Sequence, residues 1–265
     1  MSDWIHGLPV IWMAVVVFGA TYLAAAAIYV VVNALATEER GRAFKGVSPG
    51  LLPPLGIIFG LFVAFIAAQI WGDIDRANAS VNREASSLRA VVLLSKAFPE
   101  DAQTRMRALV TRHIQQARDV EWPEMARHHA TLTMVPTALG KALELVVMSP
   151  VDGAGQVAAQ RETIAALESA LDARRQRILV SRSSVNPVKW LALVLQALCT
   201  LTAIAMVHSD NRGSARIALG LFSTAIAVCV VLIAAHDRPF TGQLSVRPDV
   251  LLQVQPDSPL ATTRP

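Results

Sequence analysis

Residues 51–98 read LLPPLGIIFGLFVAFIAAQIWGDIDRANASVNREASSLRAVVLLSKAF, and this stretch decides the fold. The part from 51 to 71 carries no charged side chain. About 20 apolar residues are what an α-helix needs to cross the hydrocarbon core of a membrane. Beyond it, Ala77, Val81 and Leu88 keep the spacing of an amphipathic helix, and no glycine or proline intervenes before Pro99. The stretch predicts one long helix that crosses a membrane and continues past it.

Three more apolar runs, at 11–32, 190–207 and 217–235, have similar lengths and also contain no charged side chain. Hydrophobic residues make up 53% of the chain and charged residues only 17%, with a mean hydropathy of +0.44. Soluble domains rarely combine these values. We therefore predict an all-α membrane protein with four transmembrane helices and a helical extramembrane domain inserted between the second and third spans.

The order of apolar and polar stretches divides the chain into four parts. We expect transmembrane helices at about 10–33 and 51–72 within residues 1–72, a helical cytoplasmic domain over 73–188, two transmembrane helices within 189–236, and a partly irregular tail over 237–265. Inside the middle part, periodicity predicts helices over 101–120, 136–148 and 155–182. A break is expected at Glu121-Trp122-Pro123, and a polar connector is expected between the first two spans.

Basic residues near the spans give mixed evidence on orientation. The connector after the first span holds Arg40, Arg42 and Lys45, with no basic residue before that span, which favours an outside N-terminus. Summed over all flanks, the side of the middle domain has more lysine and arginine than the other side. We follow the sum and expect the termini and the middle domain to be cytoplasmic.

Small residues recur every four positions along the second span. They are Gly56, Gly60, Ala64, Ala68 and Gly72. Such a ridge lets helix backbones approach closely in lipid. It predicts helix packing, either against another span of the same subunit or against copies of the same helix in a ring.

A neighbouring face of this span carries Leu55, Phe59, Phe62, Ile66 and Gln69. If copies of the span surround an axis, these side chains would form a narrow apolar neck, which can gate by dewetting. A stripe that faces lipid or the protein core would have the same composition.

Polar side chains follow where the predicted span ends. Asp73, Arg76, Asn78, Asn82 and Arg89 could line an inner mouth or vestibule, or could be ordinary interfacial residues. No titratable residue lies inside a span, which disfavours proton pumps and ion-coupled transporters.

The remaining patterns argue against an enzyme, a cofactor or a metal site. His113, His128 and His129 match no zinc motif, so we expect surface histidines. Cys199 and Cys229 lie in apolar spans and are expected to be buried thiols. The net charge of +4 comes without a basic cluster interleaved with aromatics, so nucleic-acid binding is not expected.

Three segments together resemble a bacterial family described as bestrophin-like. They are GIIFGLFVAFIAAQIWGDIDRANASVNREASSLRAVVLL at 56–94, EWPEM at 121–125 and HDRPFTG at 236–242, and the resemblance covers roughly 51–250. Bestrophins are pentameric anion channels with four spans, cytoplasmic termini and an apolar neck on the second span. The resemblance implies a homo-oligomer in the bacterial inner membrane, with a pentamer favoured, that conducts small anions such as chloride.

By this resemblance Phe59, Phe62 and Ile66 would be neck positions, and the helix over 73–89 would line a vestibule. Phe65 offers a different register for the neck. The tail lacks the acidic run with which animal bestrophins bind calcium, so calcium gating is not expected. The alternative function is a non-conducting sensor or scaffold, in which the spans anchor the helical domain for a partner.

Overall fold

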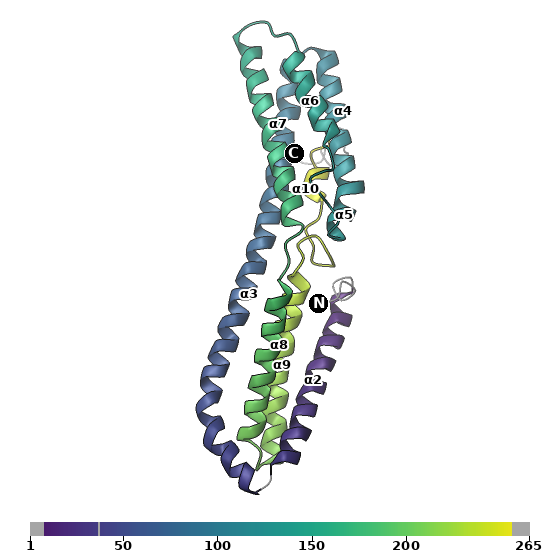
Figure 1. Ribbon diagram of the computed structural model, residues 1–265. Coiled ribbons are helices and arrows are strands. Elements are labelled where there is room, and N and C mark those ends of the chain that lie inside the picture. Colours follow the sequence, from purple (N-terminus) through teal and green to yellow (C-terminus); the bar gives the residue numbers. More distant parts are fainter. Residues whose placement is uncertain (1–7, 37, 256–265) are drawn as a thin grey trace, which may run out of the picture. The chain divides into compact units, whose positions relative to one another are not determined.

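The structure is a computed structural model that describes residues 8–36 and 38–255, and these residues form helices without any β-strand (Figure 1). The α-helices are α2 (Val10–Leu35), α3 (Glu38–Leu94), α4 (Glu100–Gln116), α5 (Trp122–Ala126), α6 (Thr137–Met148), α7 (Ala154–Val180), α8 (Pro187–Val207), α9 (Arg212–His236) and α10 (Asp249–Leu252). A 3₁₀ turn, η1 (Ser95–Ala97), follows α3, and a π-helical turn, η2 (Ala117–Glu121), joins α4 to α5.

Four helices are long and apolar enough to cross a membrane, which confirms the predicted all-α membrane fold. They are α2, the stretch Gly50–Ala97 with its apolar part before Asp73, α8 and α9. Ile11 and Leu23 of α2 and Ile217 of α9 are among many large apolar side chains that the chain leaves exposed. Lipid is the solvent in which such exposure has no cost.

Asparagine side chains start the last two spanning helices. The Asn186 side chain accepts a hydrogen bond from the Val188 N–H, and Pro187 occupies the first position of α8, where its missing N–H does no harm. Asn211 accepts hydrogen bonds from Gly213 and Ser214 at the start of α9. The short turn between α8 and α9 is therefore closed by a side-chain cap.

The helix that carries the second span begins earlier than the sequence suggested. α3 begins at Glu38, so residues 38–50 are helical where a polar connector was expected. Pro53 and Pro54 lie inside α3 and not at its start. Each proline removes one backbone donor, but the flanking turns remain helical in the structure.

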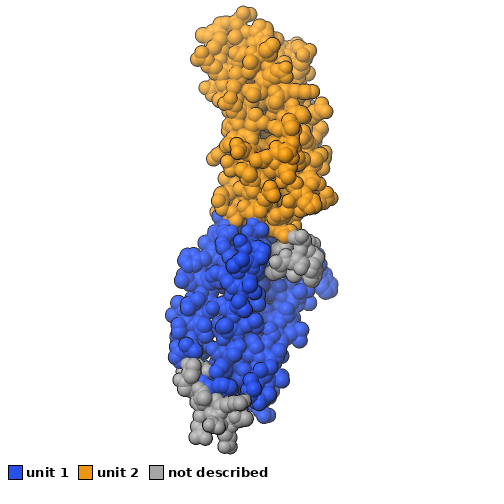
Figure 2. Space-filling model, in the orientation of Figure 1, with its two compact units in different colours: residues 1–72, 184–237, 242–244 blue, residues 73–183, 238–241, 245–265 orange. Residues whose placement is uncertain are grey.

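The chain divides into two compact units (Figure 2). Unit 1 contains the chain up to Gly72, Ser184–Asp237 and Gly242–Leu244. Unit 2 contains Asp73–Ser183, Arg238–Thr241 and the chain from Ser245 onward. In unit 1, α2 packs against α8 and α9, which also pack against each other.

Unit 2 is a helical bundle in which α6 packs against both α4 and α7. Its core contains Leu88, Met106, Leu139 and Leu167, all fully buried. The predicted helix over 136–148 is confirmed by α6. The predicted break at Glu121 is wrong, because η2 and α5 continue the helical path through Glu121 to Pro123. A π turn absorbs an extra residue without ending a helix.

Part of the tail is ordered by contacts with unit 2. Phe240, Val246 and Leu251 are buried, and the Val246 N–H donates a hydrogen bond to the Pro239 carbonyl at 2.8 Å. The tail therefore contributes to the core of this unit.

Candidate functional site

The expected neck residues lie on the face of α3 that its own chain covers. Phe59 is only 6% exposed and Ile66 only 2%. The rings of Phe59 and of Phe222 on α9 are 5.9 Å apart. Leu55, Phe62 and Gln69 are half-buried. A side chain enclosed by its own protomer does not line an axial opening, so the structure gives no support to Phe59 and Ile66 as neck residues.

Polar contacts hold this face of α3 against α8. Gln196 donates a hydrogen bond to the Leu55 carbonyl at 3.1 Å. Near the other end of the span, the Lys189 ammonium donates to the Gln69 side-chain oxygen. These two contacts fix which face of α3 points toward α8, because each is made on the same side of α3 as Phe59.

The opposite face of the span is exposed and apolar. Ile57 is 71% exposed, Leu61 is 55% exposed and Phe65 is 65% exposed, and the three are spaced by one helical turn each. Gly60 and Ala64 lie beside them, also exposed. A Cβ added at Gly60 would meet no atom within 4 Å, so the surrounding surface is open. Phe65, which the sequence gave as an alternative neck residue, lies on this exposed face.

The polar residues expected at the mouth separate into a buried one and exposed ones. Asp73 is buried and pairs with Arg76 three residues later. Arg76, Asn78, Asn82 and Arg89 are exposed on α3. These four side chains share the outward side of the helix with the exposed Asp75, Arg83 and Ser86.

Unit 2 contains a charge network that the sequence analysis missed. Arg177 on α7 is completely buried and donates hydrogen bonds to Glu84 at 2.8 Å and to Glu121 at 2.7 Å. Arg174, one turn earlier, binds Glu121 at 2.8 Å and the Met134 carbonyl at 2.8 Å. The network thus joins α3, η2 and α7 through side chains that have almost no contact with solvent.

His113 on α4 completes this network, which corrects the expectation of a surface histidine. Its Nε2 lies 2.8 Å from Glu84 Oε1, and the residue is fully buried. Its Nδ1 has no hydrogen-bond partner in the described part of the chain. The two carboxylates and the two guanidinium groups sum to zero charge, the condition under which buried charges are tolerated.

The network shifts the acidity of its members. Burial alone would raise the pKa of Glu84, but the Arg177 charge and the hydrogen bonds from His113 and Arg177 outweigh it and lower the pKa to about 2. For Arg177, burial would lower the pKa, and Glu84 and Glu121 together raise it above its ordinary value. Glu84 and Arg177 are therefore both charged at neutral pH.

The two short segments quoted for the family resemblance surround this network. In EWPEM, Glu121 binds both arginines, while Trp122 stacks under Arg177 with 4.5 Å from guanidinium carbon to ring centroid. The Trp122 N–H donates to the Val246 carbonyl at 3.0 Å. In HDRPFTG, Phe240 meets Trp122 edge to face at 5.7 Å. These residues pack the tail against the helical bundle.

A signal for the network was present in the sequence. Glu84 lies on the apolar stripe of α3 beside Val81 and Leu88, and Arg174 lies on the stripe of α7 between Leu171 and Ile178. A charge on a buried stripe indicates a buried partner. The sequence could not name that partner, because Glu84 and Arg177 are far apart along the chain.

The described residues contain no group of three or more histidine, cysteine or acidic side chains placed to hold a metal ion. Of the two cysteines, Cys199 is exposed on α8, so the expectation that it is buried is wrong for a single protomer.

Comparisons with known proteins agree with the fold. The bestrophin-like domain family matches residues 19–251. A crystal structure of a bacterial bestrophin homologue from Klebsiella pneumoniae, carrying one substitution, is similar over 91% of this chain and 96% of that chain, with a TM-score of 0.67 at 13% identity. A structure of a singly substituted membrane protein covers 89% of this chain and 95% of that one, with a TM-score of 0.65 at 14% identity. No curated protein matches.

Proposed function

Because this chain belongs to the bestrophin-like family, we propose that it forms an oligomeric ion channel that conducts small anions such as chloride. In this proposal copies of α3 surround a central axis, and a pentamer is the expected assembly. The bilayer is the bacterial inner membrane, with the termini and unit 2 on the cytoplasmic side.

The observation that carries the proposal is the exposed face of the second span. Ile57, Leu61 and Phe65 are large, apolar and uncovered by their own protomer, and they lie beside Gly60 and Ala64. Small residues let neighbouring helices approach, and the large ones then narrow the space between them. We therefore propose the register of Ile57, Leu61 and Phe65 for the neck, in place of Phe59, Phe62 and Ile66. An apolar neck of this kind gates by dewetting.

The choice of anions is supported by charge on the polar part of α3. Arg83 and Arg89 are exposed there, against the exposed Asp75, while the exposed Arg76 is paired with Asp73. A surface with excess positive charge raises the local concentration of anions.

Chloride flux into proteoliposomes that contain the purified full-length protein tests the channel and its register together. We expect flux from the wild-type protein, and an increase of severalfold for Phe65→Ala, because removal of the ring widens the neck and admits water. Phe62→Ala is the matched control, since it removes the same ring from the half-buried side of the same helix.

The outcomes separate three accounts. An increase for Phe65→Ala alone supports the proposed register, whereas an increase for Phe62→Ala alone supports the register with Phe59 and Ile66. Absence of flux from the wild-type protein and both variants would favour the non-conducting sensor or scaffold.

A further inference from the structure

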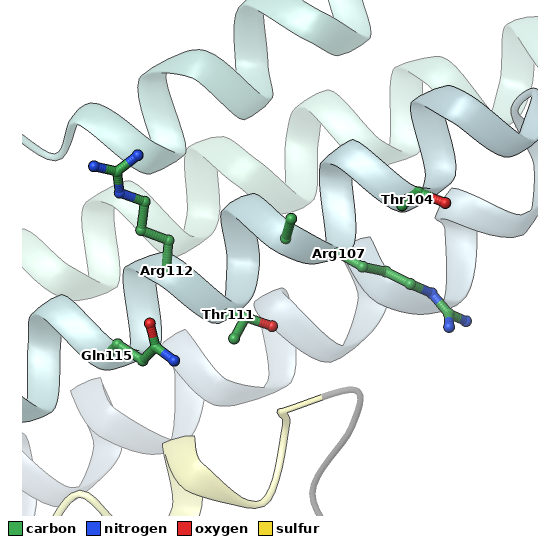
Figure 3. A pocket seen from close by; sticks show the side chains of 6 residues that line it. Thr104, Arg107, Thr111, Arg112 and Gln115 are labelled. Carbon is green, nitrogen blue, oxygen red and sulfur yellow. The ribbon is translucent and has the colours of Figure 1, made fainter.

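The outward face of α4 has a narrow row of uncharged side chains, with an arginine on each side of the row. Thr104, Thr111 and Gln115 lie along the row with Ala108, and Figure 3 shows Arg107 and Arg112 extending to opposite sides of it. Together these residues line an open concavity of about 610 Å³. Its lining runs along about three turns of α4, so a partner helix can lie along it, and its charge fits an acidic partner.

The two arginines on the flanks have no acidic partner in the described part of their own chain. No acidic residue occurs between Gln103 and Gln116, and the neighbouring Arg105 pairs with Asp101 at 3.2 Å. Arg107 and Arg112 form no ion pair with any described residue, and the buried Nε of Arg107 has no hydrogen-bond acceptor among them. A buried donor without an acceptor is costly, so this face is incomplete in the single protomer.

The outward face of α7 has the complementary pattern. Ala158 and Ala165 form a small exposed strip, and Glu162, Glu168 and Asp172 are exposed around it. Within 158–172 the only basic residue is Arg161. None of the three acids forms an ion pair with a described residue. By helical spacing Arg161 and Asp172 lie beside the two alanines, so the face has three acidic side chains and one basic one and is acidic overall.

The spacings of the two faces agree. Along the helix axis, Arg107 and Arg112 are separated by about 7.5 Å, and Glu162 and Glu168 by about 9 Å. Around the axis the arginines are about 140° apart and the glutamates about 120° apart, so each pair straddles the side chains that lie between its members. Charges that flank a close helix contact in this way select its partner.

The two faces belong to different sides of one bundle. α6 packs against both α4 and α7 and lies between them (Figure 1). We propose that the acidic face of α7 docks on the basic face of α4 in a second copy of this chain. Such a contact joins two different surfaces, so it repeats from copy to copy, and it closes into a ring when the rotation between neighbouring copies divides a full turn. The inference rests on the proposed homo-oligomer and names the surfaces that assemble it outside the membrane.

Reversing the charges of the two faces in the full-length protein in detergent tests this contact. Light scattering measures the mass of the assembly. Glu162→Arg with Glu168→Arg, and separately Arg107→Glu with Arg112→Glu, should each raise the protomer concentration at which the assembly dissociates by about tenfold or more, since like charges then face each other. All four substitutions together should restore the wild-type value. Lys141→Glu with Glu144→Lys, exposed on α6, should have no effect.

A cysteine pair gives an independent measurement. In a chain with Cys199→Ser and Cys229→Ser, Ala108→Cys with Ala165→Cys should form a disulfide between copies on mild oxidation. If the wild-type protein is monomeric, both the proposed channel and the inferred contact are overturned. If it is oligomeric while both reversals leave the assembly unchanged and no disulfide forms, only the inferred contact is overturned.

Discussion

Arg177 keeps a full positive charge although its side chain has no contact with solvent. Moving such a charge out of water costs several kcal/mol, and only well-placed partners offset that cost. Here two carboxylates accept its hydrogen bonds and Trp122 covers one face. Truncation of the arginine would leave Glu84 and Glu121 with one counter-charge, on Arg174, between them.

We expect Arg177→Met to destabilise the protein by about 3–5 kcal/mol, the usual cost of breaking one side of a buried ion pair. In detergent this would lower the melting temperature by about 10 °C. Thermal unfolding followed by circular dichroism measures it. Arg175→Met removes the same charge from an exposed position of α7 and should change stability by less than about 0.5 kcal/mol. Equal effects for both variants would contradict a special role for the network.

Glu84 makes stability depend on pH in the acid range. Its pKa is lowered to about 2 from an ordinary value of 4.5, and the residue lies in the polar part of α3, in unit 2. The carboxylate therefore stabilises the fold above about pH 4.5, by roughly 3 kcal/mol, and this contribution is lost as the pH falls from 4.5 toward 2.

The wild-type melting temperature should therefore drop steeply between pH 5 and 2.5, when measured in detergent at fixed ionic strength. Glu84→Gln cannot titrate at this position, so it should start from a lower melting temperature and decline less over the same range. Parallel curves for the two proteins would show that Glu84 does not carry the acid sensitivity.

Among the helices, α3 shows what could be predicted from sequence and what could not. Its periodicity, its apolar span and its continuation past that span follow from an uncharged run that continues as a regular stripe, whereas its start at Glu38 was not predicted. Periodicity defines two faces but does not say which one the protein covers. Phe59 and Phe65 look alike in sequence, and only contacts with α8 and α9, 141 and 163 residues later in the chain, decide between them.

The buried charges and the π turn were missed for a related reason. Glu84 departs from an apolar stripe, which indicates a partner, but the partner comes from α7 and could not be identified by spacing. In η2 the tertiary contacts of Glu121 and Trp122 favour a continuous helical path over the break that Pro123 predicts. The last two spanning helices begin at Pro187 and Arg212, a few residues before the predicted apolar runs at 190 and 217, and each start has a local asparagine cap.

The small-residue ridge of α3 gives a prediction about assembly. A Cβ at Gly60 has open space within the protomer, and leucine is a better helix former than glycine, so Gly60→Leu should fold normally. If copies of α3 pack around an axis, the larger side chain should hinder assembly and reduce chloride flux severalfold. Ala26→Leu, at an exposed position of α2, is the matched control and should change neither the assembled mass nor the flux. Unchanged flux for Gly60→Leu would place this ridge against lipid.

For the whole molecule, the proposed channel makes a prediction about ion selectivity, because permeant ions respond to the summed charge of the conduit. Arg83 and Arg89 are exposed on α3, and five or more copies would place at least ten guanidinium groups around one axis. Reversing both charges, as Arg83→Glu with Arg89→Glu, should reduce chloride flux by about tenfold and favour cations, and the effect should weaken at high salt.

Reversal potentials across a planar bilayer under a potassium chloride gradient measure this change directly. Lys96→Glu with Lys141→Glu makes the same change in net charge on unit 2 at exposed positions outside that surface of α3. Since the proposal places these lysines away from the conduit, the control should keep the wild-type reversal potential. A shift of equal size in both proteins would mean that selectivity follows net charge alone, and the polar part of α3 would then lose its proposed place along the ion path.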